Sequence, residues 1–375
     1  MKELVPVSST KITKKKAREI RLSNLLIQDE RFTKSYRDVS IINKKRIWSL
    51  EEIAKKVRDR ILDTNFLEGL SSEGIGVVSA SKLRTYRGCH FAYLLSYALH
   101  LDPPLELPQM VNGENIHKVI EDFNLDRLRT ADELINGRVQ EYFENGKRKE
   151  KKILGFKARW YGSVNSKNIY FKSENEPHVI FKMGKKLLEA FFEREKNNPK
   201  PRFAERKFDN IILTADFQDK RVAYKVRGVF DKIDIIGKKI KITDYKTGDG
   251  SDVFSDFDLQ LTLYWYAYNK LSELLPMYPK PENPEDLELA IYYLPIYSPD
   301  KIEERKTFRN KIDLKYLVNE IHNGNVGIMD KNFSPYIGHH CKDRSCFWQE
   351  LCYKLLNDNN KSLFDFIISQ YQKKN

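Results

Sequence analysis

The sequence predicts an α/β protein in which a mixed central β-sheet is flanked by helices. Two strand-like runs, residues 224–236 and 239–248, are separated by only two residues and so predict a β-hairpin. Helix-like runs lie on both sides of this hairpin in the chain, at 113–123 and 258–268, where apolar residues recur at three- and four-residue steps. Helices on both sides of a pair of strands favour a sheet covered by helices.

The turn at 237–238 predicts the register of the hairpin. Gly237 at the first turn position is typical of a type II′ turn, which places Ile236 opposite Lys239. Counting back from the turn puts apolar residues opposite apolar residues, and it puts Asp231 opposite Asp244. The predicted apolar pairs are Ile235 with Ile240 and Ile233 with Ile242.

Two carboxylates and one amine come together in this register. Directly opposed residues stand about 4.5–5.5 Å apart at Cβ, where Asp231 and Asp244 would repel unless a cation lay between them. Lys246 projects to the same side as Asp244 because side chains alternate along a strand. Hard oxygen ligands in small number favour Mg²⁺ or Mn²⁺. For these three residues alone, a surface hairpin that ends in solvated charges remains the alternative.

Each neighbouring helix adds polar residues at helical spacing. In 113–123, His117 and Glu121 share one face, so His117 is a candidate nitrogen ligand or an ordinary packed histidine. In 258–268, Gln260, Tyr264 and Tyr268 follow one another at four-residue steps. This second pattern also fits an ordinary amphipathic helix.

The order of four motifs resembles the RecB-type nucleases of the PD-(D/E)XK superfamily. They are G-x-x-x-H at 113–117, G-x-x-D at 228–231, D-Y-K-T-G at 244–248 and Q-x-x-x-Y at 260–264. Segment 78–95 is similar to the first segment of that family, although His90 stands where a proline often follows the cysteine. Similar proteins include the CRISPR-associated adaptation nucleases, the AddB nuclease domain and exonuclease V. The resemblance covers roughly residues 76 to 355, and the combination is more specific than any single motif.

The resemblance implies a restriction-endonuclease-like core with a divalent metal site. A metal bound there would polarise the scissile phosphate and lower the pKa of a bound water. The implied ligands are the side chains of His117, Asp231 and Asp244 and the backbone carbonyl of Tyr245.

The other site residues would act around that metal. Lys246 would hold or deprotonate the attacking water and offset charge on the phosphate oxygens. Gln260 and Tyr264 would orient the substrate strand or Lys246, as the resemblance implies. Glu205 either adds a carboxylate near the metal or is a charge at a strand end, and Glu121 has no assigned role.

Four cysteines supply a second candidate site. They are Cys89, Cys341, Cys346 and Cys352. No secretory leader or apolar spanning run is visible, so we expect a reducing cytoplasm and a metal centre rather than disulfides. The pattern resembles the iron–sulfur staple of the same nucleases, where a [4Fe–4S] cluster joins the two ends of the domain. The four residues between Cys341 and Cys346 exceed the usual two, and structural zinc, with His339 or His340, is the alternative.

The composition fits a nucleic-acid partner. The chain carries a net charge of +13, which favours binding to phosphates in a salt-dependent way. No strongly basic amphipathic helix points to a membrane. No G-x-x-x-x-G-K-[ST] motif occurs, so we expect a chain that cuts without translocating and that relies on a helicase or adaptation-complex partner for any unwinding.

The chain divides into a nuclease domain and two flanking segments. We expect a basic, mostly helical extension over 1–75, the nuclease over 76–358 and a helix or tail over 359–375. The nuclease would carry a helical insertion at 130–200 and the cysteine cluster at 341–352.

These observations predict a Mg²⁺- or Mn²⁺-dependent deoxyribonuclease, an exonuclease acting on single-stranded or frayed DNA ends in repair, recombination or CRISPR adaptation. The alternative is a non-catalytic subunit that keeps the fold and binds nucleic acid. The three costly charges of Asp231, Asp244 and Lys246 on one face of the hairpin argue against a retired site.

Overall fold

The structure, a computed structural model, describes most of the chain between residues 75 and 333. The described residues are 55, 59, 75–101, 106–144, 147–167, 169, 171, 175–217, 220–248, 258–330, 332, 333, 346, 348 and 352. Most of the predicted N-terminal extension, the whole C-terminal tail, His339, His340 and Cys341 lie outside these residues. The predicted domain boundaries therefore stay predictions.

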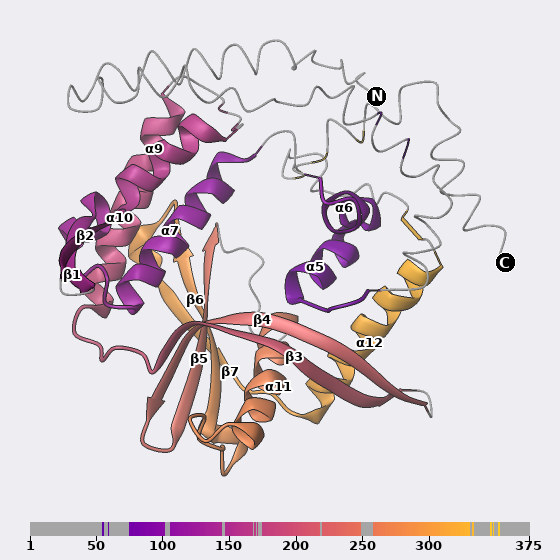
Figure 1. The fold of residues 1–375 in the computed structure, drawn as a ribbon. Coiled ribbons are helices and arrows are strands. Elements are labelled where there is room, and N and C mark those ends of the chain that lie inside the picture. Colours follow the sequence, from indigo (N-terminus) through magenta and orange to yellow (C-terminus); the bar gives the residue numbers. More distant parts are fainter. Residues whose placement is uncertain are drawn as a thin grey trace.

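A five-stranded mixed sheet forms the centre of the fold, as predicted (Figure 1). Its spatial order is β3-β4-β5-β6-β7, and every neighbouring pair is antiparallel except β5 and β6, which are parallel. The strands are β3 (Phe203–Phe217), β4 (Lys220–Ile236), β5 (Lys239–Gly248), β6 (Leu287–Pro295) and β7 (Glu303–Thr307). The parallel pair needs a long crossover, and helix α11 (Leu259–Leu274) supplies it.

The register predicted for the β4–β5 hairpin is confirmed beside the turn. Ile236 pairs with Lys239, Ile235 with Ile240 and Ile233 with Ile242. Gly237 has a φ of +61°, the left-handed value that a type II′ turn requires at its first position, and no such φ occurs at Lys238.

Helices cover both faces of the sheet. Along β5, Ile240 and Ile242 join one apolar cluster and Tyr245 joins the other, because alternate side chains point to opposite faces. The first cluster packs against α5 (Ala80–Gly88), α6 (His90–Tyr93), the π-helical turn η1 (Leu94–Ala98), α11 and α12 (Lys311–Met329). The second packs against α7 (Pro108–Asn124), α8 (Ala131–Asn136), α9 (Phe156–Ser166) and α10 (Glu176–Glu195).

The predicted insertion is only partly helical. Helices α8, α9 and most of α10 lie within 130–200, but residues between them form an antiparallel hairpin of β1 (Arg138–Glu144) and β2 (Lys147–Ile153). The helical prediction is wrong there because the many Lys and Glu residues favour a helix by propensity alone. The Asn145-Gly146 pair, typical of two-residue hairpin turns, is the signal that indicates the strands.

Two glycines of the motifs allow close approach of neighbouring elements. A Cβ added at Gly113 on α7 would lie 2.4 Å from Oγ1 of Thr247 on β5. A Cβ at Gly228 on β4 would lie 2.5 Å from the ring of Phe208 on β3. The lack of a side chain at these two glycines therefore allows α7, which carries His117, to approach β5, and β4, which carries Asp231, to pack against Phe208. None of the described helices is both long and apolar enough to span a membrane.

Candidate active site

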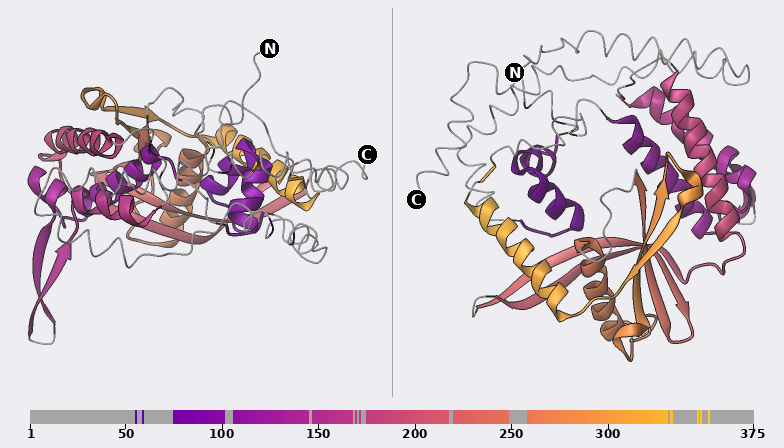
Figure 2. Two further views of the ribbon diagram at one scale, coloured as in Figure 1. Left: turned by 90° about the horizontal axis from the view of Figure 1, so that it is seen from above. Right: turned by 180° about the vertical axis from the view of Figure 1, so that it is seen from behind.

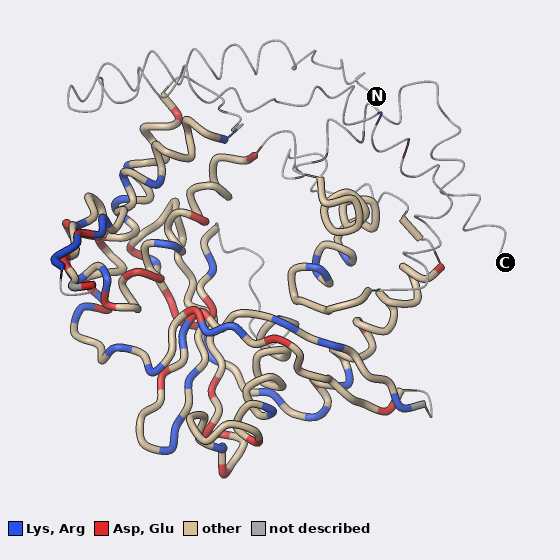
Figure 3. The backbone as a smooth tube through the Cα atoms, viewed as in Figure 1, with Lys and Arg blue, Asp and Glu red and all other residues tan. Residues whose placement is uncertain are grey.

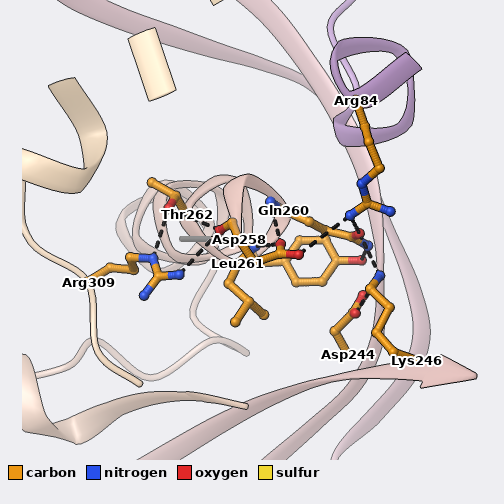
Figure 4. A network of polar contacts seen from close by, with 9 residues as sticks. Arg84, Asp244, Lys246, Asp258, Gln260, Leu261, Thr262 and Arg309 are labelled. Atoms are coloured by element: carbon orange, nitrogen blue, oxygen red, sulfur yellow. Dashed lines mark hydrogen bonds and ion pairs between the residues drawn. The ribbon is translucent and has the colours of Figure 1, made fainter. Parts of the chain in front are cut away.

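The predicted site residues lie near the point where the pairing between β4 and β5 ends. Asp231 comes from β4, Asp244 and Lys246 come from β5, and Gln260 and Tyr264 come from the first turns of α11. Figure 4 shows Asp244 and Lys246 facing Gln260, with Arg84 of α5 reaching toward them from the other side. His117 lies on α7, which crosses beside β5.

Asp244 is the most deeply buried carboxylate of the group. Its residue is 1 % exposed, and the Lys246 Nζ lies 2.6 Å from Oδ2 in an ion pair. Its other oxygen, Oδ1, has no hydrogen-bond partner among the described residues. Burial raises the pKa of Asp244, and the charge of Lys246 opposes this shift. A buried carboxylate oxygen without a partner is an unusual cost, and a bound cation would remove it.

Asp231 interacts electrostatically with Asp244, although the two residues are not a hydrogen-bonded pair of the ladder. The β4–β5 ladder ends at Lys232 and Thr243, one residue earlier than predicted. Asp231 Oδ2 instead accepts a hydrogen bond of 2.9 Å from the amide of Tyr245. Burial first, and then the charge of Asp244, raise the pKa of Asp231 well above its usual value. The observed register, continued by one residue, would place Asp231 opposite Asp244 as predicted, but the ladder ends before this pair. The predicted repulsion between the two acids is present.

Glu205 brings a third carboxylate to the same place. It lies on β3 between the pairs Ala204–Lys232 and Arg206–Phe230, which puts it alongside Asp231. Its φ is +48°, a left-handed backbone that is costly for a residue with a side chain. Burial, the charge of Glu121 and the charge of Asp244 raise the pKa of Glu205 to about 7.

His117 is neutral at physiological pH. Burial and the nearby charge of Lys246 lower its pKa to about 4. Its ring meets the ring of Tyr245 edge-on, with 6.4 Å between the centroids. A neutral imidazole has a free nitrogen lone pair with which to bind a metal.

A chain of hydrogen bonds positions Lys246. Its Nζ donates to Gln260 Oε1 at 2.9 Å, and Gln260 Nε2 donates to the Tyr264 hydroxyl at 2.6 Å. The Tyr264 hydroxyl in turn donates to the backbone carbonyl of Val229, two residues before Asp231. Burial raises the pKa of Tyr264, so its hydroxyl stays protonated and the chain keeps its direction. The four-residue spacing of Gln260 and Tyr264 thus links both strands to α11.

The donor set fits a hard divalent cation. The pKa values of Glu205, Asp231 and Asp244 are all raised by burial and by neighbouring acids, and the pKa of His117 is lowered by burial. Among the described residues, no three His, Cys, Asp or Glu side chains are close enough together to hold a metal ion as they stand. The Oδ1 of Asp244, buried with no hydrogen-bond partner among the described residues, is the clearest observation in favour of a cation here.

The sequence matches the PD-(D/E)XK nuclease superfamily over residues 77–353, which is most of the chain. The chain belongs to this superfamily. No curated protein matches it. Its central mixed sheet flanked by helices is consistent with the restriction-endonuclease-like core of PD-(D/E)XK nucleases, so the protein is a nuclease by family.

Two solved structures are similar at a low level. A candidate exonuclease from Eubacterium rectale is 12 % identical, with 75 % of this chain and 92 % of that chain covered and a TM-score of 0.36. The protein SSO0001 is 13 % identical, with 70 % and 93 % covered and a TM-score of 0.27. Because both scores are below 0.5, the family assignment depends on the family match.

Two site residues of this PD-(D/E)XK protein were missed by the sequence prediction. Arg84 places Nη2 3.4 Å from Gln260 Oε1 and 3.5 Å from Asp258 Oδ2, and its side chain is 59 % exposed. Asp258 caps α11 by accepting from the amides of Gln260 and Leu261. An aspartate directly before a helical pattern is a recognisable N-cap signal, whereas nothing in the sequence places Arg84 beside a residue 176 positions away.

The cysteines that the structure describes lie at the join between the two ends of the nuclease. Cys89, Cys346 and Cys352 are all partly buried against the first apolar cluster. Trp348, between the last two, is 3 % exposed and donates its indole N–H to Ser96 Oγ at 2.9 Å. Trp348 therefore packs on η1, a few residues after Cys89.

Proposed function

We propose that this protein is a metal-dependent DNA exonuclease that hydrolyses phosphodiester bonds at single-stranded or frayed ends. The observation that carries the proposal is the buried Asp244, whose Oδ1 has no hydrogen-bond partner among the described residues, whose Oδ2 is ion-paired with Lys246 and whose charge raises the pKa of Asp231. Membership of a nuclease superfamily supports the reaction class. The net charge of +13 supports a polyanionic substrate.

The residues that would hold Mg²⁺ or Mn²⁺ lie on α7, β4 and β5. They are His117, Asp231, Asp244 and the backbone carbonyl of Tyr245, with Glu205 as a further carboxylate. When bound, such a cation would polarise the scissile phosphate and make a water acidic enough to attack it. Oxygen ligands outnumber the single nitrogen, which favours these hard ions over zinc.

The protein's own groups would orient the reactants. Lys246 Nζ, held by Gln260, lies on the face of β5 that carries Asp244, where its ammonium would hold the attacking water by donating a hydrogen bond to it or stabilise charge on the phosphate. Arg84 would bind a phosphate oxygen from the opposite side, because its guanidinium is half-exposed beside Gln260.

Digestion of end-labelled DNA tests the catalytic proposal. We expect the parent protein to release nucleotides with Mn²⁺ or Mg²⁺, faster from single-stranded or frayed ends than from blunt duplex ends, and to leave 5′-phosphates. Asp244→Ala and Lys246→Ala should each lose at least about 100-fold in rate, as is typical when a charge-stabilising group is removed. Equal rates for all three proteins would contradict the catalytic assignment, and binding without cleavage would favour a non-catalytic subunit.

We also propose that the four cysteines bind a [4Fe–4S] cluster, with structural zinc as the competing occupant. The packing of the segment around Trp348 on η1 supports a staple between the two ends of the domain. Protein purified without oxygen should be brown, with a broad absorbance band near roughly 400 nm that is typical of thiolate-bound clusters. Cys89→Ala should remove this band, and a colourless protein loaded with zinc would contradict the cluster.

The remaining parts of the proposal concern the setting. A nuclease that lacks a phosphate-binding motor motif would act with a helicase or an adaptation complex, in the cytoplasm. Co-purification of a partner with the tagged protein tests this proposal. A partner that binds only adventitiously should be lost when the sample is washed with salt or detergent.

A further inference from the structure

The β1–β2 hairpin is exposed on both faces and projects from the insertion. Seen from above, it points away from the body of the protein (Figure 2, left). Along β2 every residue from Lys147 to Lys152 is exposed, and only Ile153 at its base is buried. The exposed residues of β1 include Val139 and Tyr142. The ribbon therefore contributes little to the core.

Charges are divided unequally between its two faces. In an antiparallel pair, directly opposed residues point to the same side, so the register sorts the side chains. One face, which we call the basic face, carries Arg138, Gln140, Tyr142, Glu144, Lys147, Lys149 and Lys151. The opposite face carries two cations and two acids, namely Arg148, Lys152, Glu141 and Glu150. Figure 3 shows the basic residues that run along this hairpin at the edge of the protein.

Ion pairs within the hairpin neutralise only part of the basic face. Lys149 pairs with Glu144, and Arg138 lies 3.8 Å from Glu133 at the base. Among the described residues no ion pair is formed by Lys147 or Lys151. On the opposite face Arg148 pairs with Glu141, and Glu150 offsets Lys152. The basic face thus keeps a net positive charge, while the opposite face is balanced.

Stability does not account for this arrangement. A two-stranded hairpin with no buried face is marginally stable in water, and like charges along one face oppose its formation. A long polyanion along the basic face would remove this repulsion. A two-stranded β-ribbon also has the width to enter the major groove of DNA.

We propose that the basic face of the β1–β2 hairpin binds the phosphate backbone of the double-stranded DNA next to the end that is cut. This inference rests on the proposed function for the identity of the polyanion, and it adds a duplex-binding arm to a site that acts on a strand end. Contacts of Lys147 and Lys151 with phosphates position the duplex without reading its sequence. Tyr142, 40 % exposed among these cations, supplies an apolar surface against the sugars.

A pair of matched variants tests the arm. Lys147→Gln with Lys151→Gln removes two cations from the basic face, and Arg148→Gln with Lys152→Gln removes two from the opposite face, so both proteins have the same net charge. Binding of a labelled 30-base-pair duplex is measured by fluorescence anisotropy in EDTA at several salt concentrations. We expect the first variant to bind at least about fivefold more weakly and to lower the salt slope by roughly 2, since each phosphate contact contributes about 0.9. The second should match the parent.

The outcomes separate this inference from the nuclease proposal. Equal weakening in both variants, no weakening in either, or a parent that does not bind duplex DNA would overturn the arm, whatever the cleavage assay shows. Weakening confined to the first variant supports the arm even if no metal supports cleavage, because binding in EDTA needs no chemistry. Cleavage of a short single strand, too short to reach the hairpin, should be equal in the parent and both variants. Circular dichroism checks that each variant is folded.

Discussion

Glu205 is a residue whose local conformation and charge both point to the proposed cation. Its left-handed backbone and its position beside Asp231 bring a carboxylate toward Asp244. The resulting repulsion and burial raise its pKa to about 7. Since the carboxyl is protonated more readily in the folded protein than in the unfolded chain, its contribution to stability is full below about pH 4.5 and is lost as the pH rises through about 7.

A divalent ion should therefore stabilise the protein more at high pH than at low pH. We expect Mn²⁺ to raise the melting temperature by a larger amount at pH 8 than at pH 5.5, because the carboxylates that bind it must be deprotonated. Scanning fluorimetry with Mn²⁺ and with EDTA measures the difference.

Glu205→Gln provides the control for that experiment. In EDTA at pH 8 this variant should melt at a higher temperature than the parent, because an uncompensated buried charge is gone. Its shift with Mn²⁺ should also depend less on pH. A Mn²⁺ shift of the same size at both pH values in the parent would contradict a cation held by these acids.

The role of Arg84 in substrate binding can be tested by comparing it with Arg87, another arginine of α5. Arg84→Ala should raise KM for a short single strand by about tenfold with a smaller change in kcat, since it removes one charge-assisted hydrogen bond to phosphate. Arg84→Lys should restore part of the loss, because lysine keeps the charge but not the planar fork. Steady-state kinetics on a single-stranded oligonucleotide gives both constants.

Arg87 on the same helix is the matched control for Arg84. It pairs with Glu320 of α12 at 2.7 Å, away from Gln260. Arg87→Ala should leave KM unchanged. Similar KM values for the Arg84 and Arg87 variants would mean that Arg84 does not bind substrate.

At the scale of elements, the contact between α7 and β5 decides where His117 lies relative to Asp244. Gly113 allows this contact, since any side chain there would meet Thr247. Gly113→Ala should lower the free energy of unfolding by about 1–3 kcal/mol, as overpacking usually does, and should also slow cleavage. Urea denaturation gives the first quantity.

Two further variants show whether the clash is the cause. Thr247→Ala removes the Oγ1 that the new methyl would meet at 2.4 Å and leaves Cβ at 3.4 Å, so the double variant should recover most of the loss. Gly162→Ala, on the exposed side of α9 with no atom within 4 Å, should instead stabilise the protein by about 0.5–1 kcal/mol. If Gly113→Ala and Gly162→Ala changed the free energy of unfolding equally, helix propensity rather than a clash with Thr247 would explain the effect at Gly113.

At the scale of the whole molecule, the packing of Trp348 joins the end of the nuclease to its beginning. Trp348→Ala should cost about 3–5 kcal/mol of unfolding free energy, as buried aromatic truncations do. Trp348→Phe should cost less, because it keeps most of the apolar contact and loses only the hydrogen bond to Ser96. Chemical denaturation measures both.

The rate of thiol labelling complements the stability measurement. The alanine variant should expose the neighbouring cysteines and label faster than the parent. Unchanged stability and labelling in this variant would contradict a structural join at this position.

Local sequence patterns predicted the elements around the site with good accuracy. The β4–β5 register followed from Gly237 and from alternation, because a two-residue turn leaves no freedom in how the strands pair. The same alternation predicted that Lys246 lies beside Asp244. The spacing of Gln260 and Tyr264 predicted a shared helix face, and the two side chains are hydrogen-bonded.

The β1–β2 hairpin and Glu205 were harder to predict from sequence. Lys and Glu are good helix formers, so their propensity concealed strands that only the Asn145-Gly146 pair indicated. The left-handed backbone of Glu205 has no sequence signal, because a glutamate rarely adopts it.

The sequence by itself determined what depends on neighbours a few residues apart: the hairpin turn, the strand faces, the helix faces and the family. Only the tertiary structure decided what depends on residues far apart in the chain. It placed Arg84 beside Gln260, ended the ladder before Asp231 and bonded that carboxylate to the Tyr245 amide. The physical reason is that backbone periodicity orients side chains locally, whereas burial and charge repulsion act between whichever elements the packing brings together.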